Sequence, residues 1–175
     1  MNHAVQGLRN PLSEEYPFYV LIETHGSNKE HDDAKLSALL EMLMENGNIK
    51  DGTVAQDETQ IRSLWSLREL IPEACSKVGA VYKYDLSVPV PQLYEIVEAL
   101  RTRLQESGLL GTDVLDVVGY GHVGDGNLHI NVTARSYADN ITKVIEPFVY
   151  ELTGILLIFY HSSKFFSCAQ GVDIS

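Results

Sequence analysis

The stretch that decides the fold runs Val118-Gly119-Tyr120-Gly121-His122-Val123-Gly124-Asp125-Gly126-Asn127-Leu128-His129-Ile130-Asn131. The apolar residues before it (114–118) and the alternating residues at its end (128–133) each predict a strand. Because side chains two apart share a strand face, His129 and Asn131 point the same way. His122 and His129 are seven apart, so a straight strand would send them to opposite faces. A turn at the glycines could bring both imidazoles to one site.

The two histidines allow two interpretations that their spacing does not separate. Neutral imidazoles suit a zinc-class metal ion, but a catalytic zinc site usually takes three protein ligands and a water. Alternatively, His122 caps the turn and His129 is a partly buried strand residue. Asp125 and Asn127 are most simply turn formers, because short polar side chains bond their own backbone in tight turns.

The composition indicates one globular domain and excludes some classes of protein. The chain has 175 residues with 45% hydrophobic content, which is enough for a sizeable core. A formal charge of −11 with no basic stripe argues against nucleic-acid binding. The longest apolar run, residues 155–160, is far shorter than the ~20 residues of a membrane helix, and no targeting peptide is visible. The widely separated cysteines Cys75 and Cys168 are typical of a protein in a reducing compartment.

Periodicity and turn residues predict strands that alternate with amphipathic helices. The strands are expected at residues 18–24, 52–55, 80–88, 114–118 and 128–133, and the helices at about 32–46, 58–78, 89–104 and 141–152. Asp32 or Asp33 is expected to cap the first helix and Asp57 the second, and Pro72 should kink the second helix. Two consecutive strands at the glycine-rich turn favour an α+β fold. We expect an antiparallel or mixed sheet with helices packed on one face, as in a ferredoxin-like layer.

Arg68 and Lys83 are the two cations whose positions admit a binding role. Arg68 follows Trp65 on a helix, where a guanidinium fork could bind a substrate carboxylate, although such arginines are more often solvated. Lys83 alternates with Val81 and Asp85 on a strand and could face a cleft, although a solvated face or an ion pair is the simpler reading. The spacing of the other histidines matches no metal-binding or catalytic motif; they are His3, His25, His31 and His161.

Three motifs together resemble the C-terminal domain of the FAD-linked 2-hydroxy-acid dehydrogenases and oxidases. They are Trp65-Ser-Leu-Arg-Glu69, Val81-Tyr-Lys-Tyr-Asp-Leu-Ser-Val-Pro89 and the stretch 119–131 quoted above. The glycine–histidine stretch is shared across that superfamily, whereas the Tyr-Lys-Tyr-Asp segment points to its hydroxyglutarate branch. The resemblance divides the chain into a lead-in (1–15), a substrate-side domain (16–153) and a divergent tail (154–175).

The resemblance implies a flavin-dependent oxidation of a small 2-hydroxy acid to a 2-oxo acid, in mitochondria and specifically the matrix. It implies that His122 and His129 bind a divalent metal, usually taken as zinc. It also implies that Arg68 and Lys83 bind substrate carboxylates and that Asn131 lies beside the substrate. FAD would be bound mainly by an N-terminal domain that this chain lacks, so no residue here is assigned to it. No membrane span and no nucleic-acid partner are expected.

The chain also departs from the family pattern. The last helix of the family is followed by Ser-x-x-Glu-His-Gly, whose glutamate completes the metal site, and no such motif follows Gly154. His161 lacks the preceding glutamate, and Pro72 stands where relatives carry a hydroxyl residue that contacts substrate. We therefore assign no catalytic residue and expect a truncated form without turnover of its own. Two alternatives to a member of the hydroxyglutarate branch stay open. One is a D-lactate dehydrogenase of the same superfamily, and the other is a non-enzymatic fragment that binds metal or pairs with full-length subunits.

Overall fold

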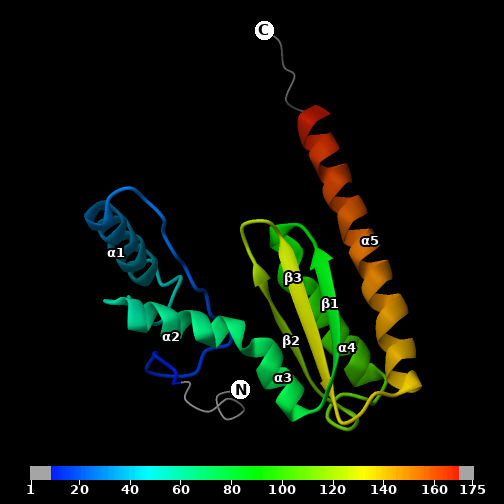
Figure 1. Cartoon of the computed structure of the whole chain (residues 1–175). Coiled ribbons are helices and arrows are strands. Elements are labelled where there is room, and N and C mark those ends of the chain that lie inside the picture. The colour runs from blue at the N-terminus through cyan, green and yellow to red at the C-terminus, as the bar shows by residue number, and fades with distance from the viewer. Residues whose placement is uncertain (1–8, 170–175) are drawn as a thin grey trace. The chain divides into compact units, whose positions relative to one another are not determined.

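The computed structural model describes the backbone of residues 9–169 and the side chains of residues 9–156. The chain divides into two units, Met1–Ala74 and Cys75–Ser175 (Figure 1). His3 lies outside the described residues, and the side chains of His161 and Cys168 lie outside the described side chains. No described helix has the length and apolar character needed to cross a membrane.

The first unit contains two helices, α1 (Lys29–Glu45) and α2 (Glu58–Glu69). Asp57 caps α2 as predicted, accepting a hydrogen bond from the Gln60 N–H at 2.9 Å. The prediction for α1 was wrong. Asn28 is the cap, and its side-chain oxygen accepts from the His31 N–H at 3.2 Å, so the helix begins three residues before Asp32.

The strands predicted at residues 18–24 and 52–55 are also absent, and both predictions were wrong. The five apolar residues 18–22 are exposed, and Val20 is 75% accessible. Apolar and β-branched composition favours an extended backbone, but a strand forms only when a neighbour supplies its ladder hydrogen bonds. The described residues of the first unit contain no strand to act as that neighbour.

The helix predicted at residues 58–78 is interrupted, as the position of Pro72 suggested. It is two helices, α2 and α3 (Ile71–Val78), with Leu70 between them. Pro72 is the second residue of α3, where the backbone N–H has no partner inside the helix. Proline is therefore tolerated there, whereas in the middle of one continuous helix it would cost about 3 kcal/mol.

The second unit is built on a three-stranded antiparallel sheet. Its strands are β1 (Ala80–Ser87), β2 (Val114–His122) and β3 (Asn127–Ala134), in the order β1-β3-β2. The short 3-10 helix η1 (Val90–Gln92) and α4 (Leu93–Glu106) connect β1 to β2, and α5 (Asp139–Ala169) follows β3. The predicted strands and the helix after Pro89 are confirmed, and β2 runs four residues beyond its predicted end at Val118.

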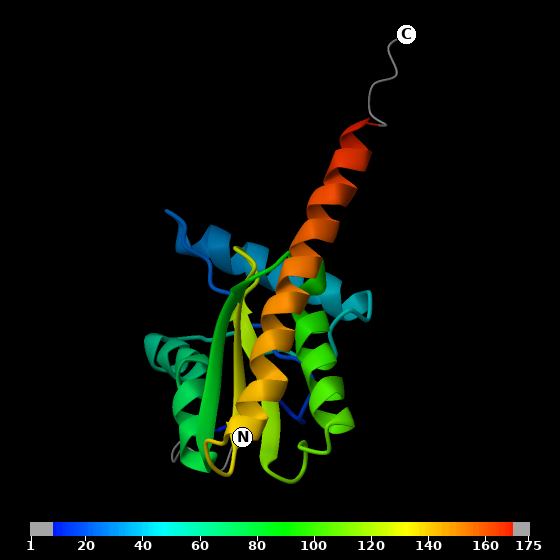
Figure 2. The same cartoon turned by 90° about the vertical axis from the view of Figure 1, so that its right-hand side faces the viewer.

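The core lies between one face of this sheet and the helices α4 and α5, which lie on the same side of it (Figure 2). Alternate strand residues supply the sheet side of the core, including Tyr84, Ile130 and Val117. The helical periodicity of α4 and α5 supplies the other side, with Ile96, Leu100, Leu104, Ile141, Ile145 and Val149 all at 1% accessibility or less. The predicted α+β fold, with an antiparallel sheet and helices packed on one face, is confirmed.

The last helix is much longer than predicted. It was expected to end at Leu152, but α5 continues through Gly154 to Ala169 (Figure 1). A single glycine inside a helix costs only about 1 kcal/mol, which is too little for Gly154 to end the helix. Most of the residues assigned to the tail are therefore helical in backbone.

Candidate metal and substrate site

The strand register places four predicted site residues on the sheet face opposite α4 and α5: Lys83, Asn131, His122 and His129. Directly paired residues of an antiparallel sheet point to the same face. Three rows of paired residues cross β1, β3 and β2 in that order: Lys83–Asn131–Val118, Asp85–His129–Tyr120 and Ser87–Asn127–His122. We call this surface the polar face.

The β2–β3 turn brings the two histidines together, as the glycine-rich sequence allowed. His122 ends β2 and His129 lies one row away on β3. Their ring centroids are 5.9 Å apart, and the rings stand edge to face at 78°. Gly126 lies in the turn with a φ of 72°, a conformation that residues with a Cβ rarely adopt. Asp125 and Asn127 also act in the turn, where the Asn127 N–H donates to Asp125 Oδ1 at 3.0 Å.

His129 is in contact with a side chain on each neighbouring strand. On β1, Asp85 Oδ2 lies 3.3 Å from His129 Nδ1. The other oxygen of the same carboxylate accepts a hydrogen bond from Asn127 Nδ2 at 2.6 Å. On β2, the Tyr120 ring lies 5.2 Å from the His129 ring, centroid to centroid. The sequence motifs did not indicate a role for Asp85, because its partners lie more than 40 residues away along the chain.

Asn131 is 1% accessible and is held by its neighbours. Its Nδ2 donates to the Tyr120 hydroxyl oxygen at 3.2 Å. Lys83, its direct partner on β1, is exposed. Lys83 and Asn131 therefore point to one side of the sheet, as binding to a common ligand would require.

Cys75, at the start of the second unit, also approaches Asn131. Burial raises the pKa of its thiol, while a side-chain hydrogen bond with Asn131 opposes that shift. Asp116 raises the pKa further and Lys83 lowers it. With its pKa raised, the thiol stays protonated at neutral pH and is a poor nucleophile.

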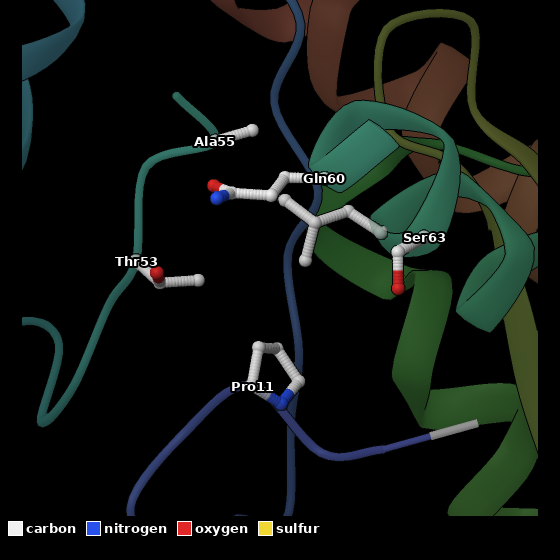
Figure 3. Close-up of a pocket in the computed structure, with 6 residues that line it drawn as sticks. Pro11, Thr53, Ala55, Gln60 and Ser63 are labelled. Carbon is white, nitrogen blue, oxygen red and sulfur yellow. The ribbon is translucent and has the colours of Figure 1, made fainter. Parts of the chain in front are cut away.

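Arg68 belongs to α2 in the first unit, where it lies in the last helical turn and is half-buried. The register groups the other four predicted residues, Lys83, Asn131, His122 and His129, on the polar face. The first unit also contains a pocket (Figure 3). Its lining carries no ionisable side chain: Pro11, Thr53, Ala55, Gln60, Ser63 and Leu64.

The histidine pair fits two of the positions around a zinc ion. With Zn–N distances of about 2.0–2.1 Å, two imidazoles on one tetrahedral ion have ring centroids on the order of 5 Å apart. The observed 5.9 Å needs only a small side-chain adjustment. Among residues 9–156, no group of three or more His, Cys, Asp or Glu side chains could hold a metal ion. The pair therefore supplies two donors and leaves the remaining positions open.

Known proteins resemble most of this chain. The family described as FAD linked oxidases, C-terminal domain, matches residues 1–161. A probable mitochondrial D-2-hydroxyglutarate dehydrogenase of Oryza sativa subsp. indica is 52% identical over 150 residues, covering 85% of this chain and 26% of the relative. The Arabidopsis thaliana mitochondrial D-2-hydroxyglutarate dehydrogenase is 50% identical over 153 residues, covering 87% and 26%.

A further relative carries a different substrate in its name. A putative mitochondrial D-lactate dehydrogenase of Schizosaccharomyces pombe is 52% identical over 150 residues, covering 83% of this chain and 28% of the relative. The chain thus spans about a quarter of the length of these relatives. The family match and the three identities lead to one conclusion: this chain belongs to the FAD-linked oxidases and corresponds to their C-terminal domain.

Proposed function

We propose that this chain is the substrate-side part of an FAD-dependent dehydrogenase that oxidises D-2-hydroxyglutarate to 2-oxoglutarate. The observation that supports this most is the polar face, where three adjacent strands gather Lys83, Asn131, His122 and His129. Residues 16–153 are the proposed functional domain. The names of relatives at about 50% identity supply the substrate class.

The proposed substrate is a dianion, and this chain supplies fixed cations for it. Lys83 binds one carboxylate as a point charge on the polar face, and Asn131 lies beside the substrate. Arg68 is proposed to bind a substrate carboxylate through its guanidinium fork.

His122 and His129 are proposed to hold a divalent cation, most simply zinc. When bound, such an ion would supply Lewis-acid polarisation of the substrate hydroxyl, which would make its proton easier to remove. The two imidazoles act as neutral nitrogen donors from adjacent strands, and the short β2–β3 turn fixes their separation.

FAD is proposed to be held mainly by the part of the relatives that lies outside the matched quarter. When bound, the flavin would supply the hydride acceptor for this oxidation. We therefore expect these 175 residues to turn over substrate only together with a part that holds FAD. The names of the relatives support a mitochondrial location, which we propose to be the matrix.

Oxidation of D-lactate is the second candidate function, because the Schizosaccharomyces pombe relative is named for it at 52% identity. Lactate has one carboxylate and hydroxyglutarate has two. The exposed Lys83 beside Asn131 favours the dicarboxylate, because a second anionic group needs a second fixed cation.

Replacement of Lys83 by alanine tests this choice. With Zn²⁺ present, the Lys83→Ala chain should bind D-2-hydroxyglutarate about 10–100-fold more weakly, as expected for the loss of one charged hydrogen bond. D-Lactate binding should change by much less. NMR titration of the 175-residue chain with each acid measures both affinities.

Lys143→Ala is the matched control for this titration. Lys143 is exposed on α5, which packs against the opposite face of the sheet, so its loss should leave both affinities unchanged. An equal loss of D-2-hydroxyglutarate binding in both variants would indicate a general charge effect and contradict the proposed role of Lys83. Tighter binding of D-lactate than of D-2-hydroxyglutarate would favour the second candidate.

A further inference from the structure

We propose that Asp85 is a positioning residue that sets the tautomer of His129, so that His129 Nε2 is the atom presented to the metal. This inference rests on the proposed function of the histidine pair. A carboxylate that accepts from Nδ1–H leaves the opposite ring nitrogen unprotonated and able to donate its lone pair to a cation. Asp85 Oδ2 lies 3.3 Å from His129 Nδ1, on the Nδ1 side of the ring.

The position of Asp85 argues against its being a metal ligand itself. It approaches the Nδ1 edge, whereas a metal bound to Nε2 would lie beyond the other edge of the ring. Asp85 pairs with His129 across β1 and β3, while His122 lies on the far side of β3, on β2. Asp85 and His122 thus approach His129 from opposite sides, so the ion would lie toward His122.

Asn127 fixes the orientation of the Asp85 carboxylate. Its Nδ2 donates to Asp85 Oδ1 at 2.6 Å, which leaves Oδ2 for His129. Asn127 is itself paired with His122 across β2 and β3. The Asp85–Asn127 hydrogen bond therefore lies next to both histidines. His129 contacts Asp85, and His122 is the strand partner of Asn127.

The Asp85–His129 contact is expected to contribute little to the free energy of folding. The Asp85 side chain is 65% accessible, and ion pairs at such positions typically contribute little to stability. A fixed tautomer, in contrast, decides which nitrogen has a free lone pair. Asp85 should therefore affect metal affinity more than folding.

Asp85→Asn is the informative substitution, because the amide has one acceptor and one donor end. Asn127 should keep the acceptor end, which turns the new NH₂ group toward His129 Nδ1. An NH₂ donor requires an unprotonated Nδ1, so the ring proton moves to Nε2 and blocks the metal position. Zn²⁺ affinity should fall about 10–100-fold, the usual effect of losing such a partner. Asp85→Ala lacks the donor and should lower affinity less.

The test uses the full 175-residue chain and has two readouts. Long-range ¹H–¹⁵N spectra of the ¹⁵N-histidine-labelled, metal-free chain at pH 8 report the tautomer of His129, whose signals are assigned by loss in His129→Gln. Calorimetric titration with Zn²⁺ reports affinity. We expect the Nδ1–H form in the unsubstituted chain, the Nε2–H form in Asp85→Asn, and the fall in affinity given above.

Asp116→Asn is the matched control. Asp116 lies on β2 and is paired with Thr133 of β3, which puts it one row beyond the row Lys83–Asn131–Val118 and two rows from His129. It should leave the tautomer and the affinity unchanged. An Nε2–H form of His129 in the unsubstituted chain, or an Asp85→Asn chain that binds Zn²⁺ as tightly as the parent, would overturn the role of Asp85. Failure of the parent to bind Zn²⁺ while the tautomer still follows Asp85 would instead reject the metal part of the proposed function.

Discussion

Replacing His122 and His129 together by alanine is expected to abolish Zn²⁺ binding by this chain. The two imidazoles are the only His pair that the described polar face brings within contact distance, and their rings lie 5.9 Å apart. Two neutral nitrogen donors on a short turn bind a divalent ion together, because closing the turn has already fixed their separation. Each single substitution should lower the affinity by at least 100-fold, and calorimetric titration measures the change.

His31→Ala is the matched control for this prediction. His31 is exposed on α1, in the first unit, and its loss should leave Zn²⁺ affinity unchanged. The prediction would be wrong if the double variant bound Zn²⁺ with the affinity of the parent, or if His31→Ala weakened binding equally. Either result would leave His122 and His129 as turn and strand residues without a ligand role.

Gly121→Ala is expected to damage both the fold of the hairpin and the metal site. A Cβ at Gly121 would lie 2.0 Å from the backbone oxygen of Asn127 on the paired strand, far inside van der Waals contact. Because backbone must move to relieve the overlap, the free energy of unfolding should fall by about 1–3 kcal/mol or more. The same shift would displace His122, the next residue, so Zn²⁺ affinity should fall as well. Urea unfolding and calorimetric titration measure the two effects.

Gly124→Ala provides the comparison within the same hairpin. A Cβ at Gly124 meets no atom within 4 Å, so stability and Zn²⁺ affinity should both stay close to those of the parent. Equal destabilisation by the two substitutions would mean that the hairpin requires glycine at both positions for another reason. It would then contradict the steric account of Gly121.

The hairpin that carries the two histidines was more predictable than residues 18–24 and 52–55, because the glycine-rich turn lies within its own local sequence. Glycines 119–126 lie between two strand patterns, and these features together predict an antiparallel hairpin. That hairpin places His122 and His129 on one face without help from distant residues. The interruption near Pro72 was predictable for a similar reason, since proline limits the helix locally.

Features that depend on distant partners were not predictable from sequence. Residues 18–24 have the composition of a strand, yet pairing and not composition decides whether a strand forms. The role proposed for Asp85 needs the β1–β3 register, which pairs residues 44 positions apart. A lone aspartate on a strand gives no local signal of that partner.

A chimera measures most directly whether the polar face acts on a hydroxy acid. Residues 16–153 of this chain would replace the matching segment of the Arabidopsis thaliana D-2-hydroxyglutarate dehydrogenase, which is 50% identical. The flavin-loaded chimera should reduce an artificial dye with D-2-hydroxyglutarate, at a higher kcat/KM than with D-lactate, and should lose this activity when His122 and His129 are both alanine. A chimera that retains flavin and the melting temperature of the parent, but reduces no dye with either acid, would contradict the proposed function.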